Sequence, residues 1–263
     1  MTTRTAGWIG DQAAHDAELF RLRALERVFD DRTRRLLTDA GVRPGARCLE
    51  VGAGAGSVTR WLAEQVGPTG SVVAVDMNCR YLTDLPDNVE VREVDASATD
   101  FGTAEFDVVH HRLVLAYVPQ REQVLQRLAV SVRPGGWLVS EEGLWMEEVL
   151  AGDTGEALMR RFFAALKPLL EAAGTDTWFA ATLPSRLREI GLTEVGHDGS
   201  CRVAQGGAVE ADAYWPLLPV LGPRLVRDHA FTEDEVQVLS RLLRDPASRW
   251  TTITVLSAWG RRP

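Results

Sequence analysis

The chain has 263 residues, of which 45% are hydrophobic. This length and composition fit one large domain with additions rather than two independent domains. A formal net charge of −8 argues against a nucleic-acid partner, because surfaces that bind nucleic acid are normally basic. The three cysteines form no CxxC pair, which argues against a disulfide framework or a zinc site. Without a signal pattern or a long apolar run, the chain is expected to be soluble and cytoplasmic, with no membrane partner.

The N-terminal stretch carries apolar side chains at helical spacing over residues 12–40. Asp30 and Asp31 predict a break between two helices in this stretch, and Gly41 is expected to end the second helix. Residues 1–45 are therefore expected to form an N-terminal helical arm.

A glycine-rich turn follows the first predicted strand, residues 47–51, which contains Glu50. A helix-compatible segment comes next, over residues 58–65. Because glycine has no side chain, such a turn lets the backbone approach a ligand closely. The order of strand, turn and helix predicts a βαβ unit. The glycines of the turn are Gly52, Gly54 and Gly56.

Two acidic residues end the next two apolar runs. Asp76 follows residues 71–75, where its carboxylate can accept hydrogen bonds from both hydroxyls of a ribose. Asp95 follows residues 89–94 and can face the exocyclic amine of an adenine. Ser57 stands where a dinucleotide fingerprint needs glycine or alanine, and no Gly-Lys-Ser/Thr ending is present. The pattern therefore favours a nucleoside-containing cofactor other than a dinucleotide.

Alternating strand and helix patterns from residue 47 onward predict a parallel sheet with right-handed crossovers. The predicted strands are 47–51, 71–75, 89–94, 106–110 and 136–141.

Five segments, in this order and at ordinary spacing, resemble the core of a class I S-adenosylmethionine-dependent methyltransferase: CLEVGAGAGS, VVAVD, VEVREVDA, FDVVHHRLVLAYVP and VRPGG. The resemblance covers residues 47–141, and its fourth segment is similar to that of bacterial small-molecule enzymes of the natural-product type. It implies S-adenosylmethionine as the cofactor.

The resemblance also implies an α/β fold: a Rossmann-like, seven-stranded, mostly parallel sheet in the order 3-2-1-4-5-7-6, with helices on both faces. The two further strands are expected near 193–204 and 251–260. Residues 46–263 would form the core, with helical caps inserted at about 143–184 and 207–247. The arm over residues 1–45 would be either a lid on the cofactor or a plain packing helix.

The residues that the resemblance places around the cofactor come from four strand ends, and at His111 the backbone carbonyl would hold the amino group of the methionine part. They are Glu50, Gly52, Gly54, Gly56, Asp76, Met77, Asp95, Ala96 and His111.

Methyl transfer needs mainly alignment and exclusion of water, together with a base if the acceptor carries a proton. The candidate bases are His111, Glu142 and His229, and for each histidine a structural hydrogen-bonding role is the alternative. Of the adjacent His110 and His111, strand alternation lets only one point to the site. Tyr117 stands where related enzymes often carry histidine. Without a paired-aspartate and asparagine cluster, we predict no metal.

The cap segments are rich in large apolar side chains that can line a substrate pocket. The alternative is that these side chains pack the extra helices on the core or on a partner in a homodimer. The candidate substrate-binding residues are Trp145, Met146, Phe163, Trp178, Tyr214 and Trp215.

The sequence therefore predicts methyl transfer to O, N or C of a small, largely apolar or aromatic metabolite. A second hypothesis is a cyclase or lyase of secondary metabolism that binds the sulfonium without transferring its methyl group. A third is a non-catalytic binding or regulatory protein. The mass of the product distinguishes transfer from the second hypothesis.

Overall fold

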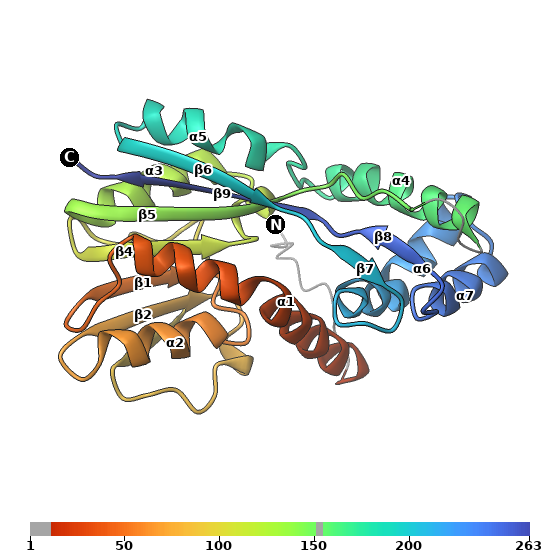
Figure 1. Ribbon diagram of the computed structural model, residues 1–263, viewed down its shortest axis with the longest axis horizontal. Coiled ribbons are helices and arrows are strands. Elements are labelled where there is room, and N and C mark those ends of the chain that lie inside the picture. The colour runs from red at the N-terminus through yellow and green to blue at the C-terminus, as the bar shows by residue number, and fades with distance from the viewer. Residues whose placement is uncertain (1–11, 151–154) are drawn as a thin grey trace. The chain divides into compact units, whose positions relative to one another are not determined.

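The computed structural model describes residues 12–150 and 155–263 (Figure 1). These residues divide into two compact units. The unit called here the sheet unit comprises residues 29–146, 169–201 and 253–263. The helical unit comprises the described residues up to 28, those of 147–168, and 202–252.

The sheet unit is built on a seven-stranded sheet in the order β3-β2-β1-β4-β5-β9-β6. The first five strands run parallel, and β9 is antiparallel to both of its neighbours. Since β9 takes the place of the seventh strand, the predicted order is confirmed. The strands are β1 Arg47–Val51, β2 Ser71–Asp76, β3 Val89–Glu93, β4 Phe106–Arg112, β5 Val132–Leu144, β6 Thr193–Ser200 and β9 Thr254–Arg261.

Helices pack on both faces of this sheet because its strands carry apolar residues on both sides. On one face, Cys48 and Val108 pack with Leu37 of α1 (Gln12–Asp39) and Leu62 of α2 (Ser57–Val66). The other face packs against α3 and α5. There Leu49, Val109 and Leu138 meet Leu128 of α3 (Arg121–Ser131) and Phe179 of α5 (Phe179–Glu189). Short 3₁₀ turns η1 (Cys79–Tyr81) and η2 (Leu115–Tyr117) follow β2 and β4.

Helix α1 runs without interruption through Asp30 and Asp31, so the predicted break into two helices is wrong. The carboxylate of Asp30 is paired rather than available to end a helix. It accepts a hydrogen bond from Arg34 one turn along the helix at 3.2 Å and another from Arg112 of β4 at 2.9 Å. An acidic residue held in this way is compatible with a helix interior.

The helical unit contains most of α4 (Glu156–Ala172), with α6 (Leu218–Arg227), α7 (Glu233–Leu242) and the turns η3 (Ala211–Ala213) and η4 (Trp215–Leu217). A two-stranded sheet pairs β7 (Val203–Gln205) with β8 (Arg249–Thr251). The buried core of the helical unit holds the rings of Phe163, Tyr214 and Trp250, with centroids 5.7–6.1 Å apart. None of the helices described in either unit is long and apolar enough to cross a membrane.

Gly136 at the start of β5 is packed against backbone. A Cβ atom built there would lie 2.6 Å from the carbonyl oxygen of Asp107 and 2.8 Å from a methyl group of Val132. Gly136→Ala is therefore expected to lower the free energy of unfolding by about 1–3 kcal/mol, because backbone has to move to relieve the overlap. Urea unfolding of the purified protein measures this loss.

The matched control is Gly199→Ala on β6, where the nearest atom is the end of the flexible Leu256 side chain at 3.0 Å. This variant is expected to stay within about 1 kcal/mol of the wild type. Equal stability of the two variants would contradict the role assigned to Gly136.

Candidate functional site

The turn between β1 and α2 has a backbone conformation that favours glycine at three positions. Gly52, Gly54 and Gly56 have φ angles of 76°, 57° and 83°, in the left-handed region that other residues rarely adopt. At Gly52 an added Cβ atom would lie 2.1 Å from a methyl group of Val114. The turn is therefore built from bare backbone and closely covered by the segment that follows β4.

Asp76 at the end of β2 is bonded to this turn, and Asp95 just after β3 is bonded to the loop that follows it. The carboxylate of Asp76 accepts hydrogen bonds from the backbone N–H of Gly54 at 2.9 Å and of Asn78 at 3.0 Å. Asp95 accepts one from the N–H of Ser97 at 2.7 Å. Carboxylates fixed beside a glycine turn suit the hydroxyls and amine of an adenosine, so the donor and acceptor groups present fit such a cofactor.

The residues that follow these two carboxylates differ in exposure. Met77 is 46% exposed and Ala96 is buried. The predicted cofactor residues thus lie at the carboxyl ends of β1, β2, β3 and, for His111, β4.

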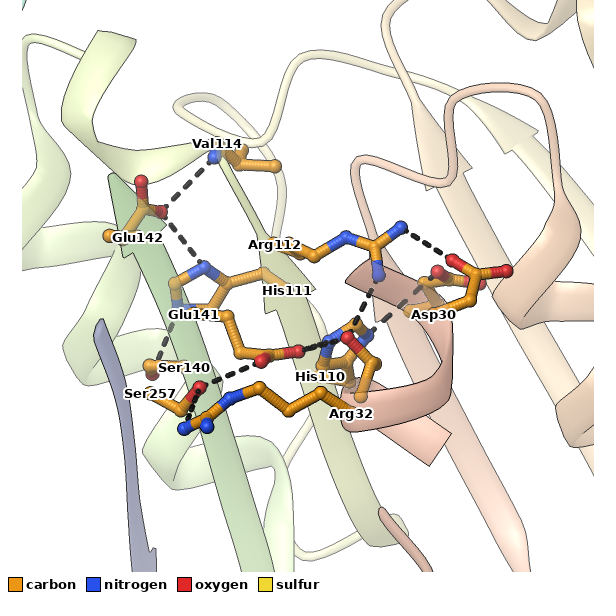
Figure 2. A network of polar contacts seen from close by, with 12 residues as sticks. Asp30, Arg32, His110, His111, Arg112, Val114, Ser140, Glu141, Glu142 and Ser257 are labelled. Atoms are coloured by element: carbon orange, nitrogen blue, oxygen red, sulfur yellow. Dashed lines mark hydrogen bonds and ion pairs between the residues drawn. The ribbon is translucent and has the colours of Figure 1, made fainter. Parts of the chain in front are cut away.

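His110 and His111 lie on opposite faces of the sheet, because successive residues of a strand alternate. His110 pairs in register with Glu50 of β1, and His111 pairs with Val51. Figure 2 shows the two rings in separate hydrogen-bond networks. Both side chains are fully buried.

On the face covered by α1, His110 lies between two carboxyl groups. Its Nε2 is 3.2 Å from Glu141, which also accepts hydrogen bonds from the hydroxyls of Thr33 at 2.6 Å and Ser257 at 2.7 Å. Burial alone would raise the pKa of Glu141. The hydrogen bond from His110, the nearby Arg112 and the bond from Thr33 outweigh burial and lower this pKa to about 2.

Glu50, the other neighbour of His110, is buried. Its carboxyl accepts a hydrogen bond from the hydroxyl of Thr59. Nδ1 of His110 lies 3.8 Å from it and has no hydrogen-bond partner among the described residues. Burial raises the pKa of Glu50 to about 8 and lowers that of His110. At neutral pH the two groups are therefore uncharged, and His110 donates its Nε2 proton to Glu141.

On the opposite face, His111 lies between Glu142 and Ser140. Its Nδ1 is 3.1 Å from Oε1 of Glu142, and its Nε2 is 2.9 Å from the hydroxyl of Ser140. Glu142 also accepts hydrogen bonds from the backbone N–H groups of residues 114–116. Both candidate bases of this face are thus fully buried and bonded to groups of the protein itself.

Three of the six candidate substrate residues belong to the sheet unit. The ring of Trp145 contacts that of Tyr117 edge-on, with centroids 6.0 Å apart. Met146 and Trp178 are 55% and 52% exposed. A hydrogen bond of 2.8 Å from the N–H of Asp176 to the carbonyl of Ala116 brings the Trp178 segment to the turn after β4.

The other three candidate substrate residues belong to the helical unit and differ in how deeply they are buried. Phe163 and Tyr214 are buried in its aromatic core. Trp215 is partly buried, donates its indole N–H to Asp212 at 3.1 Å and lies under the guanidinium of Arg244. His229 is exposed just after α6, with a φ of 55°.

Several members of the buried networks were not predicted, namely Thr33, Arg112, Ser140 and Ser257. The sequence signal for Arg112 and Ser140 is their place in or just after apolar strands, where an uncompensated polar side chain would be costly. Thr33 and Ser257 lie 108 and 116 residues from Glu141 along the chain, so no local pattern connects them.

Comparison with known proteins places the sheet unit among methyltransferases. Residues 49–140 match the model of a methyltransferase domain. The chain is similar to methyltransferase str2 of Strobilurus tenacellus, at 33% identity over 168 residues, which cover 60% of each protein. It is also similar to the ubiquinone/menaquinone biosynthesis C-methyltransferase UbiE of Ectopseudomonas mendocina, at 36% identity over 109 residues, 38% of this chain and 43% of the relative. The chain therefore spans less than two thirds of the length of these relatives.

Among solved structures, one similar fold is that of phosphoethanolamine N-methyltransferase 2 of Haemonchus contortus, in complex with phosphomonomethylethanolamine and S-adenosylhomocysteine. The TM-score is 0.54 at 15% identity, and the match covers 92% of this chain and 57% of that chain. At this identity the likeness concerns the fold alone, and it agrees with the Rossmann-like sheet.

The raised pKa of Glu50 predicts a pH dependence of stability. In the unfolded chain this carboxyl ionises near 4.5, whereas in the folded protein it keeps its proton up to about 8. The stability that it contributes is therefore lost as the pH rises through this window. Glu50→Gln should remove the loss. The free energy of unfolding of this variant, relative to that of the wild type, should therefore rise by up to about 5 kcal/mol between pH 4.5 and 8. Urea unfolding at several pH values measures this difference.

The control is Glu64→Gln at an exposed position of α2, which should follow the wild type at every pH. If Glu50→Gln follows the wild type as well, Glu50 is not a neutral acid in the folded protein.

Proposed function

We propose, from the class I S-adenosylmethionine-dependent methyltransferase domain that this chain carries, that the protein transfers the methyl group of S-adenosylmethionine to an O, N or C atom of a small, largely apolar or aromatic metabolite. The observation that carries the proposal is the turn of three left-handed glycines with Asp76 hydrogen-bonded to its middle. When bound, S-adenosylmethionine supplies an electrophilic methyl group.

The proposed cofactor contacts follow the chemistry of each residue. Asp76 would accept hydrogen bonds from the ribose hydroxyls, and Met77 beside it is exposed enough to cover an adenine face. Asp95 and the backbone of Ala96 would meet the adenine edge. The carbonyl of His111 would accept a hydrogen bond from the amino group, and Glu50, with the turn Gly52–Gly56, would lie below the methionine part.

An exposed apolar surface of the sheet unit supports an apolar or aromatic acceptor. It consists of the exposed side chains of Tyr117, Met146 and Trp178 together with the partly buried Trp145, and is called here the acceptor surface. Its residues follow β4 and β5 or precede α5, at the carboxyl edge of the sheet where open α/β folds bind ligands. Aromatic rings that are partly exposed offer a flat face for stacking. A net charge of −8 disfavours polyanionic acceptors.

The role of the helical-unit residues follows from their burial. Phe163 and Tyr214 fill the aromatic core, so we propose that they support substrate binding by holding the unit together, while Trp215 keeps its proposed contact with the substrate. Of the three candidate bases, His229 has an exposed ring and suits proton removal from a phenol or amine. For His111 and Glu142, complete burial and hydrogen bonds to the protein itself favour orientation over proton transfer.

The experiment that tests the proposal is incubation of the protein with labelled S-adenosylmethionine and a panel of phenols, ring amines and hydroquinones, followed by mass spectrometry. Gain of a methyl group by one of them supports the proposal. A product that forms without gaining a methyl group would support the cyclase or lyase alternative. Tighter binding of NADH than of S-adenosylhomocysteine would contradict the cofactor.

Asp76→Ala is expected to weaken binding of S-adenosylhomocysteine by about 1.5–3 kcal/mol, because charge-assisted hydrogen bonds to the ribose are lost. Titration calorimetry measures the change. Asp87→Ala, at an exposed position before β3, is the control and should bind as the wild type does. Unchanged affinity of Asp76→Ala would remove the ribose contact from the proposal.

Trp178→Ala is expected to raise the KM for an aromatic acceptor about tenfold, since loss of one stacked indole costs about 1–1.5 kcal/mol, while the affinity for S-adenosylhomocysteine stays unchanged. Val130→Ala, at a comparably exposed apolar position of the sheet unit, is the control. An unchanged KM in Trp178→Ala would show that acceptors do not use this surface.

A further inference from the structure

We propose that Glu142 is a positioning residue, and that its buried carboxylate holds the turn formed by residues 113–117 between the cofactor turn and the acceptor surface. This inference rests on the proposed function for its catalytic consequence. The arrangement of the turn itself is open to test without any activity.

The carboxylate of Glu142 is surrounded by hydrogen-bond donors. It accepts hydrogen bonds from the backbone N–H groups of Val114 at 3.1 Å, Leu115 at 2.6 Å and Ala116 at 3.4 Å. Nδ1 of His111 is a fourth partner at 3.1 Å. Three of these partners share Oε1 of Glu142, and Oε2 accepts the longer bond from Ala116. Three successive N–H groups converging on one anion fix the backbone that carries them.

The turn needs such a restraint because part of its backbone is strained. Leu113 has a φ of 56°, a left-handed conformation that costs a non-glycine residue of order 1 kcal/mol or more. Its N–H donates a hydrogen bond to the carbonyl of Glu141 at 2.8 Å. The main-chain carbonyl of Glu141 thus holds Leu113, and the side chain of Glu142 holds Val114.

One side of the turn contacts the glycine turn of the proposed cofactor site. The side chain of Val114 occupies the space that a Cβ atom at Gly52 would take, 2.1 Å from it. The N–H of this same Val114 is bonded to Glu142. A shift of the turn would therefore move the side chain that covers Gly52.

The other side of the turn belongs to the acceptor surface. The carbonyl of Ala116 accepts a hydrogen bond from the N–H of Asp176, and the ring of Tyr117 packs edge-on against Trp145. Because the turn has contacts on both sides, a single carboxylate sets the distance between the group that gives the methyl and the group that receives it. Displacement reactions depend strongly on this alignment.

The hydrogen bonds determine the tautomer of His111. An ionised Glu142 can only accept, so Nδ1 of His111 carries the proton, and Nε2 accepts a hydrogen bond from the hydroxyl of Ser140. Figure 2 shows the carboxylate of Glu142 between Val114 and the ring of His111. His111 thereby orients the carboxylate, and Ser140 orients His111.

The experiment compares Glu142→Gln and Glu142→Ala with Glu141→Gln, which changes an equally buried carboxylate on the other face. Hydrogen–deuterium exchange of the amides of Val114, Leu115 and Ala116 is measured first. It should become at least about tenfold faster in both Glu142 variants, because loss of a charge-assisted hydrogen bond costs about 1.4 kcal/mol or more. In Glu141→Gln these amides should exchange as in the wild type. Unchanged exchange in both Glu142 variants would overturn the inference.

The catalytic arm uses the best acceptor found in the metabolite panel. In Glu142→Gln, kcat should fall at least about tenfold with the KM for S-adenosylmethionine within about threefold and with unchanged pH dependence. A fall in kcat with unchanged amide exchange, and with the disappearance of an ionisation from the pH profile, would make Glu142 a base and overturn the inference.

A third measurement needs no variant and no activity. Nitrogen-15 NMR of the histidine rings in the wild-type protein should show His111 protonated at Nδ1, and an Nε2-protonated ring would contradict the proposed network. If the protein methylates nothing and does not bind S-adenosylhomocysteine, the proposed function fails, while exchange and tautomer still decide the role of Glu142.

Discussion

Burial of three carboxyl groups at the carboxyl ends of β1 and β5 is the constraint on which the rest of the sheet unit depends. Glu50, Glu141 and Glu142 are each at most 4% exposed, and a buried carboxylate destabilises a fold unless donors surround it. The structure meets this need in three ways. Glu141 is surrounded by hydroxyl and imidazole donors, Glu142 by backbone N–H groups and His111, and Glu50 keeps its proton. The arrangements around Glu141 and Glu142 require groups from elements distant in sequence.

Because side chains alternate along β4, the hydrogen-bond partners of Glu141 and Glu142 lie on opposite faces of the sheet. On one face, Arg112 donates hydrogen bonds to Asp30 and Thr33, and His110 is linked to Thr33 through Glu141; these bonds fix the part of α1 that follows Phe29. On the other face, His111 connects β4 to β5 and to the turn after β4. One pair of adjacent histidines therefore anchors a covering helix and a loop of the proposed site. Methyl transfer asks a protein mainly for alignment, so rigid support of this kind is chemically useful even where no side chain transfers a proton.

The two units differ in what they contribute to the proposed function. The sheet unit holds the segment that matches a methyltransferase domain, together with an exposed aromatic surface of its own. The helical unit buries two of the aromatic residues that the sequence suggested for substrate contact, Phe163 and Tyr214. Large apolar side chains in a segment outside a known domain can thus have either of two roles. They can form the hydrophobic core of that segment, or they can line a ligand site. Exposure separates the two cases.

The sequence by itself determined five strands of the sheet and the glycine turn, because apolar runs, the spacing of Gly52, Gly54 and Gly56, and the acid at position 76 are all local patterns. The strand order came from the resemblance of these segments to a known family. It also offered His111 and Glu142 as site residues, since polar groups in apolar strands need a reason. Only the tertiary structure decided which partners these groups have. Thr33 and Ser257 approach Glu141 from more than a hundred residues away, and Asp30 stays helical because Arg112 lies opposite it. Hydrogen bonds between distant segments leave no periodicity in the sequence, and so the networks that hold the site became visible only once the strands were paired.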